Sequence, residues 1–377
     1  MKIFVVPATY NERENIEKFI TILEEEVFPK IKNHDMHIIV ADDFSPDGTG
    51  EIVKNLMKKY KNLGINQGEK KGLGAAYMRT MGYAIKELGA DVVVSIDADF
   101  QFDPHDLVKF VEKIDEGCDM VVQTRYSKGG SIPENWPPQR KLFSIVANLF
   151  VRTVFMKFSV HDWTGGFRAI KKEVFLKVSP EMEKYNGYIF QIAFLHKVVN
   201  DGFKIGEVPL HFSDRKLGMS KIAPLGYIID VLSFVIITRI KELITGPFGK
   251  FLVVGGTGFI IQAIILRIMV GIFNIDPTIS NLSGAVVAIF SNYNLNNFWT
   301  FRAERVKSIG QYAWKLLNFY ATSAIGVILI QTGIIFLGDQ LFGKKYYFVY
   351  FIVGTAILLI YNFTVYRLVI WRKKPHK

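Results

Sequence analysis

The stretch DVVVSIDADFQFDP (91–104) begins as an apolar strand and ends in a group of carboxylates. Its valines and isoleucine are typical of a strand that is covered on both faces. Asp97 and Asp99 follow at positions i and i+2, where both can turn toward one hard cation, and Gln101 continues the alternation with a neutral oxygen. Asp103 precedes a proline and is predicted to cap the next helix. The sequence predicts a Mg²⁺ or Mn²⁺ site here, although an Asp-x-Asp pair alone also occurs in loops and caps.

Short apolar runs alternate with amphipathic helical patterns on both sides of this stretch. Alternation of this kind predicts an α/β domain with a parallel sheet covered on both faces, whose ligands bind at the carboxyl ends of the strands. Asp42-Asp43 ends the second predicted strand as Asp97 and Asp99 end the fourth, so we expect one site at one edge. The predicted strands are 2–8, 37–43, 63–66, 91–97 and 119–126, and the predicted helices are 13–31, 48–60, 74–88 and 104–114.

Two segments in the middle of the chain read as broad apolar helices with few polar positions. The segment 138–158 carries a narrow polar stripe, and 224–243 is similar, with polar residues interrupting its apolar sequence. Both patterns are typical of helices that lie in a membrane interface, and a pair of buried core helices is the alternative. Among the polar positions are Lys141, Ser144, Asn148 and Arg152 in the first segment and Asp230, Ser233 and Lys241 in the second.

Four long apolar stretches follow Gly246, at about 249–272, 279–300, 316–337 and 346–370. Each has roughly the 20 residues that a bilayer crossing needs. Basic residues gather between the second and third stretches and in the final RKKPHK, which predicts that both termini and the catalytic part are cytoplasmic. We therefore expect a catalytic domain over 1–245, including the two interfacial helices, and a four-helix transmembrane domain over 246–377.

Overall composition narrows the classes of partner. The 377 residues carry a formal net charge of +11, which suits anionic membranes or phosphorylated ligands. No basic stripe interleaved with aromatic residues and no zinc-finger spacing is present, so nucleic acid is not an expected partner. The one cysteine, Cys118, cannot form an internal disulfide and is expected to pack as a small apolar residue. The N-terminus has too short an apolar run for a signal peptide.

Three loops hold groups that suit phosphates or sugars. GEKKGLGAAYMR (68–79) combines glycines, lysines and a helix start, which permits close approach of phosphates to the backbone. DWTGGFRA (162–169) sets a tight turn beside Trp163, a candidate aromatic platform for a sugar. DRKLGMSK (214–221) supplies cationic and hydroxyl donors for phosphate oxygens. A turn at Asp47-Gly48 capped by Asp42, and a solvated basic loop at 214–221, remain the plain alternatives.

Seven blocks in this order resemble glycosyltransferase family 2, and within it the dolichol- or polyprenyl-phosphate mannose synthases. They are VVPATYNERENI, VADDFSPDGTG, KKGLGAAY, DADFQFDP, DWTGGFRAI, YIFQ and LGMSK, and they extend over residues 1 to about 245. The segment from FGKFLVVGGTGFIIQ through SNYNLNNFWTFR is similar to the GtrA-like four-helix membrane domain. The resemblance implies a GT-A (Rossmann-like) fold, a GDP-mannose donor, a divalent cation, a dolichyl or polyprenyl phosphate acceptor and a lipid bilayer around the second domain.

The resemblance also assigns roles to residues. The cation would be held by Asp97, Asp99 and Gln101, and the sugar candidates are Trp163, Gly165, Gly166 and Gln191. Asp99, Arg125, Arg215 and Lys221 are the expected catalytic residues. Acceptor or diphosphate contacts are expected from Arg125, Arg140, Arg215, Ser220 and Lys221, of which Arg140 is added for its expected depth at the headgroups. The nucleotide would be surrounded by Pro7, Tyr10, Glu12, Asp42, Asp43, Gly72, Leu73, Gly74, Arg79, Asp97 and Ala98.

The reaction expected from this resemblance is a single displacement with inversion. Gln191 stands where many inverting relatives have an acidic base. A lipid phosphate is already an anion near neutral pH, so aligning the acceptor and neutralising charge replace proton removal. Three alternatives stay open: glucosyl transfer from UDP-glucose to the same kind of lipid, nucleotidyl transfer at an Asp-x-Asp metal site, and a flipping or transport role for the membrane helices.

Overall fold

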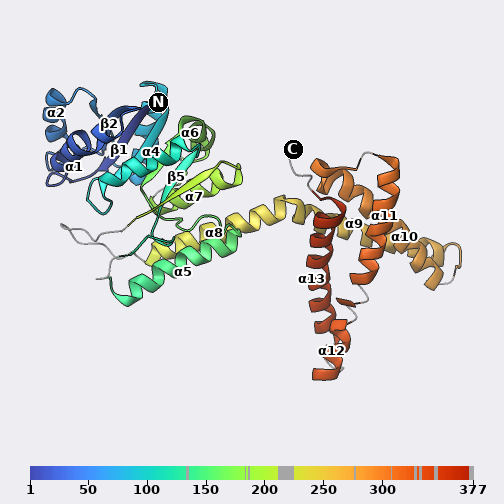
Figure 1. Cartoon of the computed structure of the whole chain (residues 1–377). Coiled ribbons are helices and arrows are strands. Elements are labelled where there is room, and N and C mark those ends of the chain that lie inside the picture. Colours follow the sequence, from blue (N-terminus) through green and yellow to red (C-terminus); the bar gives the residue numbers. More distant parts are fainter. Residues whose placement is uncertain are drawn as a thin grey trace. The chain divides into compact units, whose positions relative to one another are not determined.

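A computed structural model gives the structure of the chain (Figure 1). It divides into two compact units, Met1–Ile237 and Thr238–Lys377. The predicted boundary after residue 245 coincides with the end of helix α8, which runs across this division. The described residues are 1–132, 136–182, 184–185, 187–210, 225–275, 277–306, 308–326, 329–330, 333–343 and 347–372.

The first unit is built on a seven-stranded sheet in the order β3-β2-β1-β4-β6-β5-β7. Its strands are β1 (Lys2–Thr9), β2 (Asp35–Asp42), β3 (Leu63–Gln67), β4 (Val92–Asp97), β5 (Met120–Thr124), β6 (Arg168–Lys171) and β7 (Ile205–Pro209). Its helices are α1 (Ile16–Ile22), α2 (Thr49–Lys59), α3 (Leu73–Lys86), α4 (Leu107–Asp115), α5 (Pro138–Phe155), α6 (Lys172–Val178), α7 (Gly187–Asn200) and α8 (Leu225–Thr245).

The predicted parallel pairing is present between the first four strands of the sheet order, but strand β6 is antiparallel to its neighbours. β3, β2, β1 and β4 are parallel neighbours, and their register sets Thr9 beside Asp42 and Ala8 beside Asp97. β6 is antiparallel to both β4 and β5, so the sheet is mixed. The prediction of a wholly parallel sheet is wrong here, because four residues, RAIK, are too few to show a strand period in the sequence. Parallel pairing still brings the ends of β1, β2 and β4 to one edge.

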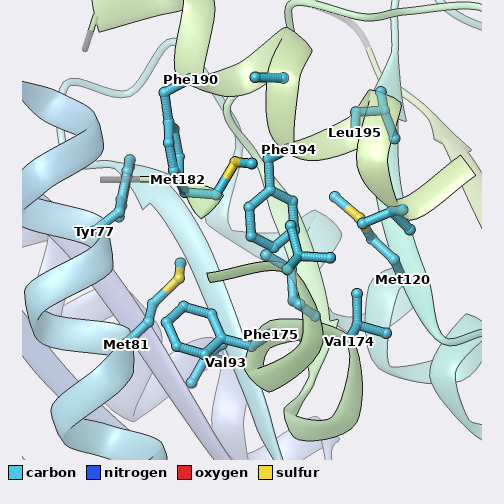
Figure 2. Close-up of a cluster of buried hydrophobic side chains, with 14 of the residues drawn as sticks. Tyr77, Met81, Val93, Met120, Val174, Phe175, Met182, Phe190, Phe194 and Leu195 are labelled. Atoms are coloured by element: carbon cyan, nitrogen blue, oxygen red, sulfur yellow. The ribbon is translucent and has the colours of Figure 1, made fainter. Parts of the chain in front are cut away.

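Helices cover both faces of this sheet. Ile3 and Val5 of β1 lie in a core with α1, α2 and α4, while Phe4 and Val6 lie in a second core with α3, α5, α6, α7 and part of α8. Figure 2 shows part of the second core, where Tyr77 and Met81 of α3 face Phe190 and Phe194 of α7. Cys118 is buried and unbridged, as predicted.

Helix α5 presents apolar side chains outward and its polar stripe inward. Leu142 and Phe143 are 62% and 63% exposed, and Ile145, Val146 and Leu149 are also exposed. In the stripe, Ser144 contacts the Tyr126 hydroxyl at 2.5 Å, and Asn148 accepts from the Trp163 backbone N–H at 2.8 Å. The alternative of a buried core helix is therefore wrong for α5. An outward apolar face supports the interfacial prediction.

The second unit is helical. Its helices are α9 (Pro247–Gly271), α10 (Pro277–Leu295), α11 (Ile309–Gly326), α12 (Gly333–Phe342) and α13 (Tyr347–Val365), with π-helical turns η5 (Asn296–Thr300) and η9 (Tyr366–Ile370) and a 3-10 turn η6 (Arg302–Glu304). Among the described residues, two helical stretches are long and apolar enough to cross a membrane, Pro247–Gly271 and Ile352–Ile370. The predicted stretch 316–337 includes described residues of α11 and α12, and 327–328 and 331–332 between them lie outside the described residues.

Candidate active site

Asp97 and Asp99 lie where β4 ends, as predicted. Asp97 is the last residue of the strand and is partly exposed, and Asp99 is 8% exposed. The Tyr77 hydroxyl donates to Asp97 Oδ1 at 3.0 Å, and the Gln101 backbone N–H donates to Asp99 Oδ1 at 3.1 Å. Carboxylate oxygens on one short loop fit a hard divalent cation. Four residues on, Asp103 accepts from the His105 N–H at 3.0 Å, which confirms the predicted cap.

Tyr77 keeps its proton throughout the physiological range. Burial raises the pKa of Tyr77 well above 10, and the charges of Asp97 and Asp99 raise it further. The hydroxyl therefore remains a donor to Asp97 and orients that carboxylate. The sequence motif contains this tyrosine, but no signal in it distinguishes an orienting hydroxyl from a core aromatic ring.

Left-handed residues follow three neighbouring strands at the same edge. Asn11, Phe44 and Phe100 have φ angles of 61°, 47° and 58° and stand two or three residues after β1, β2 and β4. A side chain with a Cβ carries strain in this region, and such residues cluster at functional sites. Each turn reverses the chain at the carboxyl end of its strand, which brings three loops together.

The Asp42 carboxylate accepts hydrogen bonds from several parts of the chain at the end of β2. It is fully buried and accepts hydrogen bonds from Thr9, from both the backbone and the hydroxyl of Ser45, and from Gln67 Nε2 at 2.9 Å. The turn at Asp47-Gly48 is capped by Asp47 itself, which accepts from the Thr49 N–H and hydroxyl, and the predicted nucleotide contact of Asp42 stays a prediction. The carboxylate fixes the loop after β2.

Asp43 and Arg79 form an ion pair beside this carboxylate. Arg79 donates two hydrogen bonds to Asp43 Oδ1 at 3.1 and 3.2 Å and a third to Asn66 Oδ1 at 2.9 Å. Burial raises the pKa of Asp43, and Arg79 opposes that shift. Gly68 is required for this pair, because a Cβ there would collide with the guanidinium. Arg79 therefore ties the loop after β2 to strand β3.

The remaining nucleotide candidates surround the same edge. Tyr10 is 40% exposed, and Lys70 Nζ lies 3.2 Å from the centre of its ring. Glu12 is partly buried, with its backbone N–H bound to the Thr49 hydroxyl. The exposed ring beside a cation could stack on a base, and Lys70 is an addition to the predicted set. Pro7 and Ala98 are buried in or next to the central strands.

Gly72, Leu73 and Gly74 begin helix α3. Gly72 has φ 97°, and Leu73 is the first helical residue. A Cβ on Gly74 would approach the Phe190 ring to 2.9 Å, so glycine permits α3 and α7 to pack closely. Gly74 and Arg79 also line a pocket of about 490 Å³ that extends to α6 and Tyr185. This pocket does not include Asp97 or Asp99.

Gly166 and Gln191 lie beside Asp97. A Cβ on Gly166 would be 3.6 Å from Asp97 Oδ2 and 3.9 Å from Gln191 Nε2, so both polar groups face this glycine. The Ser95 hydroxyl donates to the Gly166 carbonyl at 2.7 Å and fixes it to β4. Gly165 packs against Gln123 with no room for a side chain. The structure thus brings two of the sugar candidates, Gly166 and Gln191, next to Asp97.

Arg168 holds the backbone at Gly165 and Gln191 in place through hydrogen bonds. It is buried and donates to the carbonyls of Gly165, Gln191 and Trp163 at 2.8, 2.7 and 3.3 Å. Burial lowers the pKa of Arg168 to about 9, so the guanidinium stays charged at neutral pH. Sequence reasoning missed Arg168, because its partners are carbonyls, which every residue carries. Trp163 is fully buried and packs against Phe155, which corrects the predicted open aromatic platform.

Arg125 is held in a buried ion pair. Its Nε and Nη2 donate to the two carboxylate oxygens of Asp162 at 2.7 and 2.9 Å, and Nη2 also donates to the Thr164 hydroxyl. The two side chains are 9% and 0% exposed. In this structure the charge of Arg125 is matched by Asp162 and enclosed, and its predicted phosphate and catalytic roles stay predictions. The pair shapes the turn that carries Gly165 and Gly166.

The other predicted phosphate ligands divide into two groups. Arg140 lies in the first turn of α5, with its guanidinium 3.7 Å from the centre of the Trp136 ring. Arg215, Ser220 and Lys221 lie outside the described residues, so their predicted roles remain predictions.

Replacing Tyr77 with phenylalanine is expected to weaken cation affinity while leaving the fold intact. The change removes one hydroxyl that orients Asp97, and loss of such an orienting group costs about 10- to 100-fold in metal affinity. Titrating transfer activity with Mn²⁺ measures the shift. Tyr83 to phenylalanine on the exposed side of α3 is the matched control, and equal Mn²⁺ dependence in both variants would contradict the role of Tyr77.

Known proteins match the chain over both units. The family model for Glycosyl transferase family 2 matches residues 4–179, and the family model for the GtrA/DPMS transmembrane domain matches residues 250–371. Polyprenol monophosphomannose synthase from Mycolicibacterium smegmatis is 35% identical over 221 residues, which is 58% of this chain and 80% of that protein. Dolichol-phosphate mannosyltransferase from Pyrococcus furiosus is 30% identical over 375 residues, 98% of this chain and 99% of its own length.

A solved structure shows a more distant likeness. Glucosyl-3-phosphoglycerate synthase from Mycobacterium tuberculosis, in complex with Mn²⁺, UDP and glucosyl-3-phosphoglycerate, is 20% identical with a TM-score of 0.45 and covers 63% of this chain and 79% of its own. The full-length relative carries the family assignment, since its match extends through both units in the same order. The chain therefore belongs to glycosyltransferase family 2 and carries a GtrA/DPMS transmembrane domain after its catalytic part.

Proposed function

We propose that the chain transfers mannose from GDP-mannose to dolichyl or polyprenyl phosphate, with inversion at the anomeric carbon. The observation that carries this proposal is the 30% identity over 98% of the chain to dolichol-phosphate mannosyltransferase. The arrangement around β4 supports it, since two aspartates, a glycine turn and Gln191 meet at one strand end.

The residues present fit a divalent cation at Asp97 and Asp99, with Gln101 as a third oxygen. When bound there, Mg²⁺ or Mn²⁺ would stabilise the negative charge of the leaving diphosphate. Tyr77 holds Asp97 in place, and the Gln101 backbone N–H holds Asp99. Tyr10 and Lys70 would receive the base at the end of β1.

Gln191 places an amide beside Asp97, at the position where many inverting relatives have an acidic base. Its amide lies next to Gly166 and Asp97, where it can orient a sugar hydroxyl but cannot remove a proton. A phosphate acceptor needs no such base, because it is already ionised. Alignment behind the anomeric carbon and neutralisation of charge are then the main catalytic tasks. Arg215, Ser220 and Lys221 are proposed for the acceptor phosphate.

The membrane arrangement is part of the same proposal. The four apolar stretches after Gly246 would supply four spans, and the basic residues between the second and third stretches and at the C-terminus favour a cytoplasmic catalytic unit and cytoplasmic termini. The outward apolar face of α5 would rest in the interface and set the catalytic unit at headgroup depth.

A panel of labelled nucleotide sugars tests the function. The full-length protein in detergent is given GDP-mannose, UDP-glucose or other donors and a short polyprenyl phosphate, with and without Mn²⁺. We expect lipid-phosphate-mannose of inverted configuration and release of GDP, only with GDP-mannose and cation present. Transfer from UDP-glucose would support the glucosyl alternative, inorganic diphosphate would indicate nucleotidyl transfer, and transfer to water would overturn the acceptor.

A further inference from the structure

A basic groove lies in the second unit, at one end of its helices. Its volume is about 840 Å³, and its walls come from the start of α9, from η5 and η6, and from η9 with the residues that follow it. Lys250, Arg302, Arg367 and Arg372 line it, with Glu304 as the one carboxylate among its lining residues. These segments are far apart in sequence, so the fold itself gathers the charges.

The four cations of this basic groove have no protein counter-ion in the part of the chain that the structure describes. No described carboxylate lies within 4 Å of any of their side-chain nitrogens, whereas such pairs are frequent in the first unit. Arg302, Arg367 and Arg372 are exposed, and Lys250 is partly buried. Four cations and one carboxylate, Glu304, leave the lining with excess positive charge, so an anionic ligand would relieve the repulsion among the cations.

The residues beneath the basic groove are held in place by packing and hydrogen bonds within the protein. Trp371 is 1% exposed and stacks on Phe301 with ring centres 4.7 Å apart. Trp371 Nε1–H donates to Asn297 Oδ1 at 3.0 Å, and the same oxygen accepts from the Val306 N–H at 2.9 Å. These contacts hold the two chain segments that carry Arg302 and Arg372. A preformed site loses less entropy when it binds a ligand.

The rim combines this charge with apolar surface. Trp299 is 43% exposed, and Lys250 Nζ lies 5.8 Å from the centre of its ring. Leu368 also lines the groove and is 62% exposed. Tryptophan at the end of membrane helices is typical of headgroup depth, and basic pockets between such helices bind acidic headgroups. A small soluble anion would use the arginines but would leave the exposed tryptophan and leucine uncovered.

We propose that the basic groove binds the phosphate group of an anionic membrane lipid through residues of the second unit alone. The arginines donate paired hydrogen bonds to the phosphate oxygens, and the acyl or prenyl chain covers Trp299 and Leu368. The lipid could be a bulk phospholipid or a polyprenyl phosphate, since both carry this group. The proposal rests on the membrane assignment of the second unit and not on the identity of the donor sugar.

Native mass spectrometry of the full-length protein tests this proposal. The protein is released from detergent containing equal amounts of phosphatidylglycerol and phosphatidylcholine, and bound lipids are counted. We expect the wild type to retain phosphatidylglycerol preferentially. The triple variant R302Q, R367Q and R372Q is expected to bind it about a hundredfold more weakly, at roughly fivefold for each cation removed. Retention of phosphatidylcholine equal to that of phosphatidylglycerol would overturn the proposal.

Two further variants separate charge from folding. R302K, R367K and R372K keep the charge and should restore affinity to within about fivefold of the wild type. R305Q is the matched control, since Arg305 stacks on Phe298 and does not line the groove, and it should leave binding within about twofold. Equal retention by the glutamine triple variant and the wild type would overturn the proposal.

Competitors identify the source of the phosphate. Displacement of phosphatidylglycerol by undecaprenyl phosphate supports the site and indicates that it also accepts the prenyl lipid, while failure to displace supports a phospholipid site. Displacement by millimolar inorganic phosphate would overturn the lipid part, because the hydrocarbon chain would then contribute nothing. Because binding is counted directly, failure of mannose transfer would not affect the result.

Discussion

Replacing Asp99 with alanine is expected to lower kcat/KM for sugar transfer by at least about a hundredfold. Asp99 is 8% exposed at the end of β4, and the change removes one of two carboxylates available to a cation there. The expected loss comes from the diphosphate leaving group, whose charge would no longer be stabilised. Initial rates of lipid-phosphate-sugar formation over a range of Mn²⁺ concentrations measure it.

Asp103 to alanine is the matched control for this variant. Asp103 lies on the same loop but caps the turn before α4, so its loss should cost about 1 kcal/mol of stability and leave transfer nearly unchanged. Both variants should insert into membranes and elute as the wild type does in detergent. Full transfer by the Asp99 variant, or by the wild type after chelation of all divalent cations, would refute the metal assignment.

Replacing Arg125 with methionine is expected to destabilise the first unit by about 3–5 kcal/mol. The change leaves Asp162 fully buried without its cation. Burial by itself would raise the pKa of Asp162, but Arg125 holds it below its ordinary value. In the wild type this pair therefore contributes stability above about pH 4, which is lost as the pH falls through the lower folded value.

The variant should show the opposite pH dependence. Without Arg125, burial raises the pKa of Asp162, so protonation stabilises the folded state and the apparent melting temperature should rise between pH 7.5 and 5. Adding Asp162 to asparagine should recover much of the loss, because the amide removes the buried charge. Lys54 to methionine breaks an exposed pair with Glu51 and should cost less than about 1 kcal/mol. Equal losses of stability in the Arg125 and Lys54 variants would contradict the inference that the Arg125–Asp162 pair is buried.

Structural features could be predicted from the sequence where a local residue pattern is compatible with a single type of element. The apolar run before Asp97 predicts a buried strand, and the proline after Asp103 predicts a cap, and both are present. The parallel order of β1 and β4 then places two strand ends at one edge. These features depend on the nearest few residues and on the twist and pairing rules of sheets.

The direction of polar side chains could not be predicted in this way. Asp42 and Arg125 have the chemistry of ligands, but each is engaged by partners elsewhere in the chain: Gln67 is 25 residues from Asp42, and Asp162 is 37 residues from Arg125. Arg168 donates hydrogen bonds to backbone carbonyls, and because every residue has a carbonyl, the sequence gives no signal for these contacts. Only the folded chain distinguishes a charge that meets a ligand from one that is already matched.

The outward apolar row of α5 has a consequence for encounter kinetics. A catalytic unit that rests on the bilayer through this helix meets a lipid acceptor by lateral diffusion, and the effective acceptor concentration is counted per unit area of membrane. We expect the rate to follow the mole fraction of acceptor in the bilayer rather than its amount per volume. Diluting the membrane with neutral lipid would then slow transfer, whereas diluting the suspension with buffer would not.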